Sequence, residues 1–258
     1  MAGFMVPLAG DPKAALQRWR TTAARLLQLG GDSDGNDMVL FVDGDAAFAA
    51  MLAAIKSAQI RVWLETYIFE PDALGTRMLA ALTAAARRGV DVRLLVDDHG
   101  SGHLTPTHTA EFVAAGGVVA RFNPTHLLQW KRPLSLRDHR KILIVDNDHG
   151  FLGGMNVSVD YGGPQLGNNR FRDTHLLLTG PTTSDLALVF GRSWHHATGN
   201  LPAEVVPAAP RADGSHVQIL GSDRFRRRRR IQRALATAVQ RVATPSAGQR
   251  WESGTLRV

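Results

Sequence analysis

The stretch IRVWLETYIFEPDALGTRMLAALTAAARRGVDVRLLVDD, residues 60–98, decides the fold. Within it, residues 60–69 alternate apolar side chains with others, which is the spacing of a strand. Residues 74–88 repeat apolar side chains at helical spacing and end at Gly89, and residues 90–98 form a second apolar run. A strand, a helix and another strand of these lengths predict an α/β fold with a mostly parallel or mixed sheet.

The same alternation of strands and helices continues on both sides of this stretch. In chain order, we expect a helix over 12–29, a loop through 37, a strand over 38–43, a helix over 45–56, a helix over 107–115, a strand over 118–122, a hairpin of strands over 141–146 and 151–156, a strand over 172–181 and a helix over 182–196. These elements predict an α-β-α sandwich, in which helices flank a mixed sheet.

A second, shorter pattern near the end of the chain predicts an internal repeat. The segments VQILGSD (217–223) and IQRALATAVQRV (231–242) echo VLFVDGD (39–45) and FAAMLAAIKSAQIRV (48–62). The alternative is a C-terminal strand and helix of no repeat origin. The expected domains are an N-terminal helix and loop over 1–36, a catalytic half over 37–200, a linker over 201–216, and a truncated start of a second repeat over 217–258.

Composition limits the possible chemistry and partners. The 258 residues include 30 Lys and Arg against 23 Asp and Glu, which favours an anionic partner. The chain has no cysteine, which excludes disulfides, thiolate metal sites and a cysteine nucleophile. The histidines lack metal-ligand spacing, so we expect neither a metal nor a cofactor. The N-terminus lacks the apolar run of about 20 residues that a membrane-spanning helix needs, which favours a cytoplasmic protein, soluble or peripheral.

The segment DHRKILIVD, residues 138–146, carries the strongest chemical signal. It spells H-x-K-x4-D, and residues two apart on a strand face the same side, so His139 and Lys141 should point into one pocket. A neutral imidazole can attack phosphorus, and an ammonium can hold the oxygens on which charge builds. This pairing favours phosphoryl transfer. The alternative is that His139 merely caps the strand and Lys141 is solvated.

A glycine pair follows on the next short strand. In FLGGMN (151–156), Gly153 and Gly154 would let the backbone approach a bound phosphate, and the amide of Asn156 could donate to a phosphate oxygen. Glycines also end many hairpins, so the pair is weak evidence by itself.

These residues resemble the HKD motif of the phospholipase D superfamily, and their surroundings are similar to bacterial cardiolipin synthases. The segments that carry this resemblance are YIFEPDALG (67–75), ARRGVDVRLLVDDHGS (86–101), RDHRK (137–141) and RDTHLLLTGP (172–181). The resemblance implies a phospholipase D-like fold with its second repeat only begun.

The resemblance also implies roles for individual residues. His139 would form a phosphohistidine or protonate the leaving alcohol, while Lys141 and Asn156 would bind the phosphate. Asp146, the last residue of the motif, would be a hydrogen-bonding support. Asp173 would orient the imidazole, although a surface acid paired with Arg172 is the alternative.

Other residues near these motifs have two interpretations each. His175 could approach the pocket, but a satisfied structural histidine is the simpler interpretation. Glu65 and Tyr67 share one strand face and would line the pocket or only support the sheet edge. The segment 127–132, LLQWKR, suits a membrane interface or an ordinary loop, and the arginine-rich run 224–233 suits a lipid phosphate, a nucleic acid or a solvated face.

The family's site normally uses two HKD motifs, and this sequence contains one. Three hypotheses follow: a shortened cardiolipin synthase-like enzyme, a homodimeric single-motif phosphodiesterase or nuclease, and a non-catalytic phospholipid-binding remnant. The resemblance favours phosphatidyl transfer on an anionic phospholipid such as phosphatidylglycerol, at the inner face of the membrane. Nucleic acid is the less favoured substrate because no interleaved aromatic residues form a stacking platform.

Overall fold

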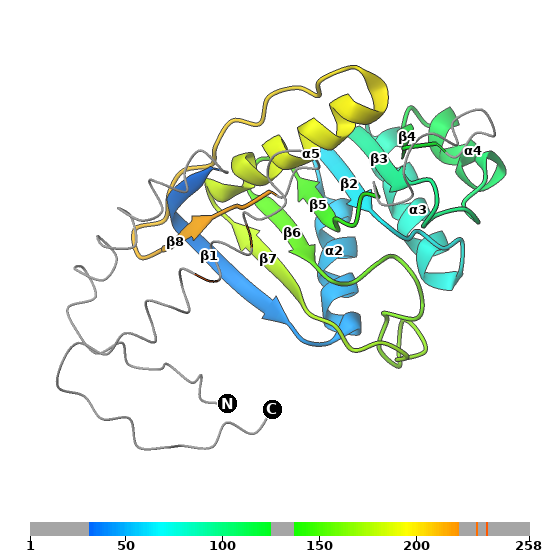
Figure 1. The fold of residues 1–258 in the computed structure, drawn as a ribbon, viewed down its shortest axis with the longest axis horizontal. Coiled ribbons are helices and arrows are strands. Elements are labelled where there is room, and N and C mark those ends of the chain that lie inside the picture. Colours follow the sequence, from blue (N-terminus) through cyan, green and yellow to red (C-terminus); the bar gives the residue numbers. More distant parts are fainter. Residues whose placement is uncertain (1–30, 125–136, 222–230, 232–235, 237–258) are drawn as a thin grey trace. The chain divides into compact units, whose positions relative to one another are not determined.

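The computed structural model describes residues 31–124 and 137–221, together with Ile231 and Ala236 (Figure 1). The chain divides into two units, Gly31–Ile219 and a second made of Met1–Gly30 with Leu220–Val258. Almost all of the second unit lies outside the described residues, as do the expected helix over 12–29, the segment 127–132 and most of the arginine-rich run. The unit Gly31–Ile219 contains the sheet and the helices that pack on it.

A mixed sheet forms the centre of this unit, as the sequence predicts. Its strands are β1 (Asp32–Phe41), β2 (Arg61–Thr66), β3 (Asp91–Asp97), β4 (Val118–Phe122), β5 (Ile142–Val145), β6 (His149–Gly153), β7 (His175–Thr179) and β8 (Ser215–Gln218). Across the described residues their order is β4-β3-β2-β5-β6-β7-β1-β8. The pairs β2–β3 and β3–β4 are parallel, whereas the other neighbours are antiparallel.

Helices cover both faces of the sheet. They are α2 (Gly44–Ser57), α3 (Ala73–Arg87), α4 (Pro106–Ala114) and α5 (Thr182–Thr198). One apolar cluster joins the sheet to α2, α3 and α4, and a separate cluster joins its other face to α5 (Figure 1). The expected α-β-α sandwich is therefore confirmed.

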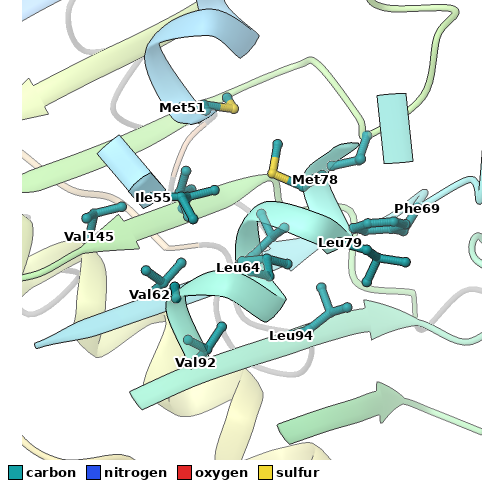
Figure 2. Packing of buried hydrophobic residues seen from close by; sticks show 14 of the residues in the cluster. Met51, Ile55, Val62, Leu64, Phe69, Met78, Leu79, Val92, Leu94 and Val145 are labelled. Carbon is teal, nitrogen blue, oxygen red and sulfur yellow. The ribbon is translucent and has the colours of Figure 1, made fainter. Parts of the chain in front are cut away.

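Strand alternation explains how one strand serves both layers. Every residue of β2 is buried. Val62 and Leu64 pack against α2 and α3, near Ile55 and Met78 (Figure 2), while Trp63 stacks on Phe190 of α5 at 5.3 Å between ring centroids. Each large apolar side chain buried in this way contributes about 1.5–3 kcal/mol. A strand that is apolar on both faces is what a central position in the sheet requires.

The structure moves several predicted boundaries. β1 begins at Asp32, inside the expected loop, because its first residues pair with β8, for example Asp32 with Gln218. The predicted boundaries at 36/37 and 216/217 therefore fall inside two neighbouring strands of one sheet. The expected strand over 172–181 is shorter, His175–Thr179. The pairing that extends β1 joins residues about 180 positions apart, so local spacing does not show it; the second repeat itself stays a prediction.

Asp146 joins the end of β5 to the beginning of β2. Its backbone is left-handed, with φ of 53°, and its carboxylate points toward the start of β2. The carboxylate accepts hydrogen bonds from the backbone N–H groups of Gln59, Ile60 and Arg61, at 2.7–3.1 Å. Its own N–H donates to the carbonyl oxygen of Arg61 at 2.9 Å. This geometry agrees with a supporting role for the last residue of the motif.

We therefore expect Asp146→Ala to lower the free energy of unfolding by about 2–3 kcal/mol, because three amides lose their acceptor and alanine adopts a positive φ poorly. Asp146→Gly removes the carboxylate without the backbone strain, and Asp146→Asn keeps an acceptor and tolerates the φ. The expected order of loss is Ala, Gly, Asn. Urea denaturation followed by circular dichroism measures it, and an unchanged midpoint for Asp146→Ala would contradict this role.

Candidate active site

His139 and Lys141 lie in an irregular segment that leads into β5. β5 begins only at Ile142, so the expectation that both residues are on the strand is wrong. The segment is held instead by Asp97, a fully buried residue at the end of β3. One carboxylate oxygen of Asp97 accepts from the backbone N–H of Asp138 at 2.9 Å, and the other lies 3.6 Å from the Arg137 guanidinium. A side-chain acceptor here replaces the strand pairing that the backbone lacks.

The ring of Tyr67 brings the two motif residues together. The ring of His139 lies 4.8 Å from it, centroid to centroid, and the Lys141 ammonium lies 5.3 Å from its centroid. The ammonium also donates to the carbonyl oxygen of His139 at 2.9 Å. His139 is exposed, whereas Lys141 is buried. The pair therefore presents an accessible imidazole above a buried cation, although the two do not share a strand face.

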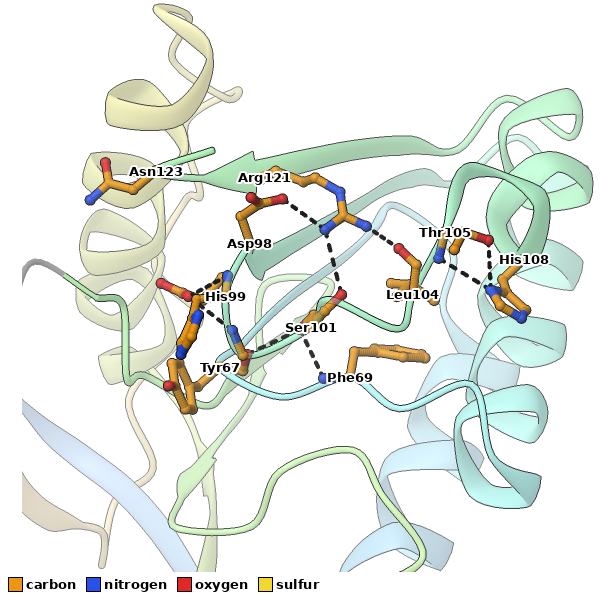
Figure 3. Close-up of polar contacts among 12 residues, drawn as sticks. Tyr67, Phe69, Asp98, His99, Ser101, Leu104, Thr105, His108, Arg121 and Asn123 are labelled. Atoms are coloured by element: carbon orange, nitrogen blue, oxygen red, sulfur yellow. Dashed lines mark hydrogen bonds and ion pairs between the residues drawn. The ribbon is translucent and has the colours of Figure 1, made fainter. Parts of the chain in front are cut away.

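The loop after β3 fixes Tyr67 (Figure 3). The Ser101 hydroxyl donates to the Tyr67 carbonyl oxygen at 3.0 Å and accepts from the N–H of Phe69 at 2.9 Å. Arg121 ties this loop down, because its guanidinium bonds the Asp98 carboxylate at 2.9 Å and the Leu104 carbonyl oxygen. Tyr67, which the sequence left between a pocket role and a sheet-edge role, is a wall of the site.

Burial controls the charge of both motif residues. It lowers the pKa of His139, with a further decrease from Lys141, while Asp138 and Asp97 oppose the change. Burial also lowers the pKa of Lys141 to about 8, against the opposing charges of Asp138, Asp173 and Asp97. At neutral pH the imidazole is thus favoured in its neutral, nucleophilic form while the neighbouring ammonium keeps its charge.

Asp173 and His175 are the next ionisable groups around Lys141. The charge of Asp173 raises the pKa of both Lys141 and His175. Burial lowers the pKa of His175 to about 4, so its imidazole is neutral. Its Nδ1 has no hydrogen-bond partner within the described part of the chain, which differs from the satisfied histidine that the sequence suggested. The carboxylates that act on His139 are Asp138 and Asp97, so the pairing of Asp173 with His139 stays a prediction.

The glycine pair is explained by these neighbours. A Cβ on Gly154 would lie 2.2–2.4 Å from the carboxylate of Asp173. A Cβ on Gly153 would lie 2.5 Å from the Thr174 carbonyl oxygen and 2.7 Å from both Cα and Nδ1 of His175. Both positions need glycine for packing, whether or not a phosphate approaches them.

Asn156 is buried and holds two parts of the site together. Its Oδ1 accepts from the N–H of Ile68 at 3.1 Å, and its Nδ2 donates to the Tyr161 hydroxyl at 2.9 Å. An amide nitrogen carries two hydrogens, so one remains for a phosphate oxygen. Its predicted role as a phosphate ligand stays open beside this structural one.

Comparison with known proteins identifies the family. The family description "Cardiolipin synthase, PLD-like domain" matches residues 51–162, a range that contains His139, Lys141, Asp146 and Asn156. This region of the chain is a phospholipase D-like domain similar to that of cardiolipin synthases.

Individual relatives agree with this assignment. The phospholipase D-like domain is similar to cardiolipin synthase A of Pseudomonas aeruginosa (strain LESB58), at 35% identity over 188 residues, which are 72% of this chain and 38% of that protein. It is also similar to the cardiolipin synthase of Geobacillus kaustophilus (strain HTA426), at 35% identity over 164 residues, covering 62% of this chain and 32% of that protein. The chain thus spans less than two-fifths of the length of these relatives.

A solved structure supports the fold. The crystal structure of phosphatidylserine synthase from Haemophilus influenzae Rd KW20 superposes with a TM-score of 0.51 and 13% identity, covering 71% of this chain and 44% of that one. At this identity the likeness concerns the fold alone. It confirms the expected phospholipase D-like α/β architecture.

Sequence reasoning missed Asp97 and did not predict the surroundings of Glu65. Asp97 ends an apolar strand two residues before His99, and an acid at such a position commonly caps the next turn; here it accepts from the N–H groups of His99 and Gly100, at 3.0 and 3.2 Å. Glu65 was considered only for the pocket or the sheet edge, but it lies buried on the α5 side of the sheet. Its signal was an acid directly after the apolar run of Val62, Trp63 and Leu64. The structure shows no candidate metal cluster in the residues it describes, and no helix among them is long and apolar enough to span a bilayer.

The glycine contacts give a matched pair of variants. Gly153→Ala meets backbone and should lower the free energy of unfolding by about 1–3 kcal/mol, because β6 and β7 must move apart. Gly154→Ala meets the Asp173 side chain, which can rotate, so its loss of stability should be smaller.

The Gly154→Ala variant should also change the Lys141 pKa. Displacing Asp173 removes a charge that raises the pKa of Lys141, and that pKa should fall further. Thermal unfolding and NMR titration of the Lys141 ε-methylene test both effects; equal stability of the two variants would contradict the packing argument.

Proposed function

We propose that this chain is the catalytic half of a phosphatidyltransferase or phospholipase D-type phosphodiesterase that acts through a phosphohistidine on His139. One observation carries the proposal: the accessible imidazole of His139, whose pKa is lowered by partial desolvation and by a neighbouring cation, lies beside the buried Lys141 ammonium. The family assignment and the names of the relatives support phosphatidyl transfer in particular.

The proposed reaction has two balanced steps. An imidazole nitrogen of His139 attacks the phosphorus of a phosphodiester, a P–N bond forms, the P–O bond to one alcohol breaks, and that alcohol leaves with a proton. A second alcohol, or water, then attacks phosphorus, gives up its proton, and releases His139. Lys141 neutralises the non-bridging oxygens in both steps, and the free N–H of Asn156 is suited to donate to one of them.

The alcohol leaves faster if it receives a proton, and the family's chemistry assigns that role to a second histidine. The sequence holds one H-x-K-x4-D motif. A second copy of the chain in a homodimer, or a second motif in a longer protein, would provide it. The two sources differ in a measurable way, because only the homodimer makes specific activity rise with protein concentration together with the dimer fraction.

The proposed substrate is an anionic phospholipid such as phosphatidylglycerol at a membrane surface, with the inner face as its expected location. The excess of Lys and Arg, 30 against 23 Asp and Glu, supports attraction to an anionic surface. The similarity to cardiolipin synthases supports a phospholipid rather than a nucleic acid.

The direct test incubates the full chain with vesicles of radiolabelled phosphatidylglycerol and separates the lipids by thin-layer chromatography. Wild type should form a new phospholipid or phosphatidic acid, and acid-labile label should stay on the protein. His139→Ala should lower turnover at least about a thousandfold, because the nucleophile is gone. His195→Ala, an exposed histidine on α5, is the matched control and should leave turnover unchanged. Full activity of His139→Ala would overturn the assignment.

The pH dependence of kcat/KM should be bell-shaped. Activity should rise with pH through the His139 pKa, which lies below 6.5, because only the neutral imidazole attacks. It should fall as pH rises through about 8, where Lys141 loses its charge. In Lys141→Arg the alkaline limb should move upward, because a guanidinium stays protonated. An alkaline limb that does not move would show that another group titrates there.

A further inference from the structure

A buried acid pair lies behind His139, on the side of the sheet that faces α5. Glu65 of β2 is 1% exposed and Asp138 is 5% exposed. The polar groups that act on Glu65 are Asp138 and Arg140 from the segment before β5, and Ser193 from α5. The proposed mechanism uses none of these four side chains.

One cation faces two acids in this cluster. The guanidinium of Arg140 lies 3.6 Å from Oε1 of Glu65 and 3.8 Å from Oδ1 of Asp138. It also donates to the hydroxyl of Ser193. The Lys141 ammonium also acts on Asp138. If both carboxyl groups were ionised, Glu65 and Asp138 would still be two neighbouring buried carboxylates that repel each other, which is strongly unfavourable.

Three carboxyl oxygens of the cluster have no donor within hydrogen-bond distance in the described part of the chain, although the Ser193 hydroxyl lies close enough to act on Glu65. Both carboxyl oxygens of Glu65, and Oδ2 of Asp138, are buried without a hydrogen-bond partner among the residues that the structure describes. An ionised carboxylate can only accept, so two ionised carboxylates cannot satisfy each other. One proton changes this, because a protonated Glu65 donates to Asp138 and no longer repels it. Burial, followed by the charge of Asp138, raises the pKa of Glu65 well above its ordinary value, in agreement with this geometry.

We propose that Glu65 and Asp138 share one proton in the folded protein, and that this pair, together with Arg140, positions His139. The positioning part rests on the proposed function; the shared proton does not.

Asp138 and Arg140 link the buried acid cluster directly to His139. Asp138 and Arg140 are its two chain neighbours, and the N–H of Arg140 donates to Oδ1 of Asp138 at 3.3 Å. Their side chains enter the acid cluster, while His139 lies against Tyr67. Because the segment is not paired as a strand, the cluster on one side and Asp97 beneath it determine where the imidazole points. Glu65 is therefore a positioning residue, without contact to the reacting atoms.

The shared proton is tested by carboxyl NMR on the full chain. Glutamate labelled with ¹³C at the side-chain carboxyl gives five signals, from Glu65, Glu70, Glu111, Glu204 and Glu252, and Glu65→Gln identifies the first. The Glu65 signal should keep its protonated shift at pH values well above 4.5, the ordinary value for a glutamate. In Asp138→Asn it should titrate at lower pH than in wild type, because the negative neighbour is gone. A Glu65 signal that titrates at or below 4.5 overturns the proposal.

Stability gives a second, independent measure. A Glu65 pKa above its ordinary 4.5 means that the folded state holds a proton that the unfolded chain has lost. From pH 4.5 up to the raised value, the unfolding constant of wild type should rise by up to about tenfold per pH unit relative to that of Glu65→Gln. Glu111→Gln, which alters an exposed glutamate, is the matched control and should keep the wild-type slope. Parallel pH profiles of wild type and Glu65→Gln would contradict the shared proton.

The positioning role is tested with two replacements of similar size. Glu65→Gln keeps a donor toward Asp138 and should hold kcat within about twofold of wild type, whereas Glu65→Met offers none and should lower kcat about tenfold or more with KM little changed. The ¹⁵N imidazole shifts of His139 should change in Glu65→Met and not in Glu65→Gln, a readout that needs no activity. A Glu65→Met protein with wild-type kcat and wild-type His139 shifts overturns the positioning role. An inactive wild type with these NMR results would refute only the proposed function.

Discussion

The hydrogen bonds of one buried carboxylate, Asp97, hold the candidate site together. One of its oxygens caps the turn after β3, through the N–H groups of His99 and Gly100, and the other accepts from Asp138. The turn then presents Ser101, which fixes the backbone around Tyr67. The nucleophile and the ring beside it thus depend on the same side chain, although they come from segments about 70 residues apart. Such a constraint replaces the regular pairing that the segment before β5 lacks.

The insertion of β5 between β2 and β6 explains why the two ends of the motif have different roles. β5 runs antiparallel to β2, with Ile142 opposite Glu65 and Val145 opposite Val62. Its beginning therefore lies at the carboxyl ends of β2 and β3, where loops are free to form a site. Its end lies at the start of β2, where Asp146 accepts backbone amides. The four residues of β5 thus separate Lys141, which belongs to the candidate site, from Asp146, which supports the fold.

Local pattern predicted the parallel core well and the long-range features poorly. Residues 60–98 fold as expected, because hydrophobic spacing there reports on contacts within the same unit. The start of β1 at Asp32 and the site roles of Glu65 and Asp97 depend on partners more than 30 residues away, and spacing carries no information about them. The sequence correctly predicted that His139 and Lys141 lie together, but not why. Both contact the ring of Tyr67, and Lys141 donates to the carbonyl oxygen of His139; they do not share a strand face.

Burial favours the neutral form of four ionisable groups in and around the site. It raises the pKa of Glu65 and lowers those of His139, Lys141 and His175. The acids Asp138, Asp97 and Asp173 raise the pKa of Lys141 against burial, so Lys141 keeps a positive charge at neutral pH. For His175, burial outweighs the charge of Asp173, and the imidazole stays neutral. A phosphodiester arriving at His139 therefore meets one buried cation and a neutral nucleophile. Because the Lys141 ammonium is buried, its attraction for the negative charge that develops on phosphate oxygens is stronger than it would be in water, although the three acids share that charge.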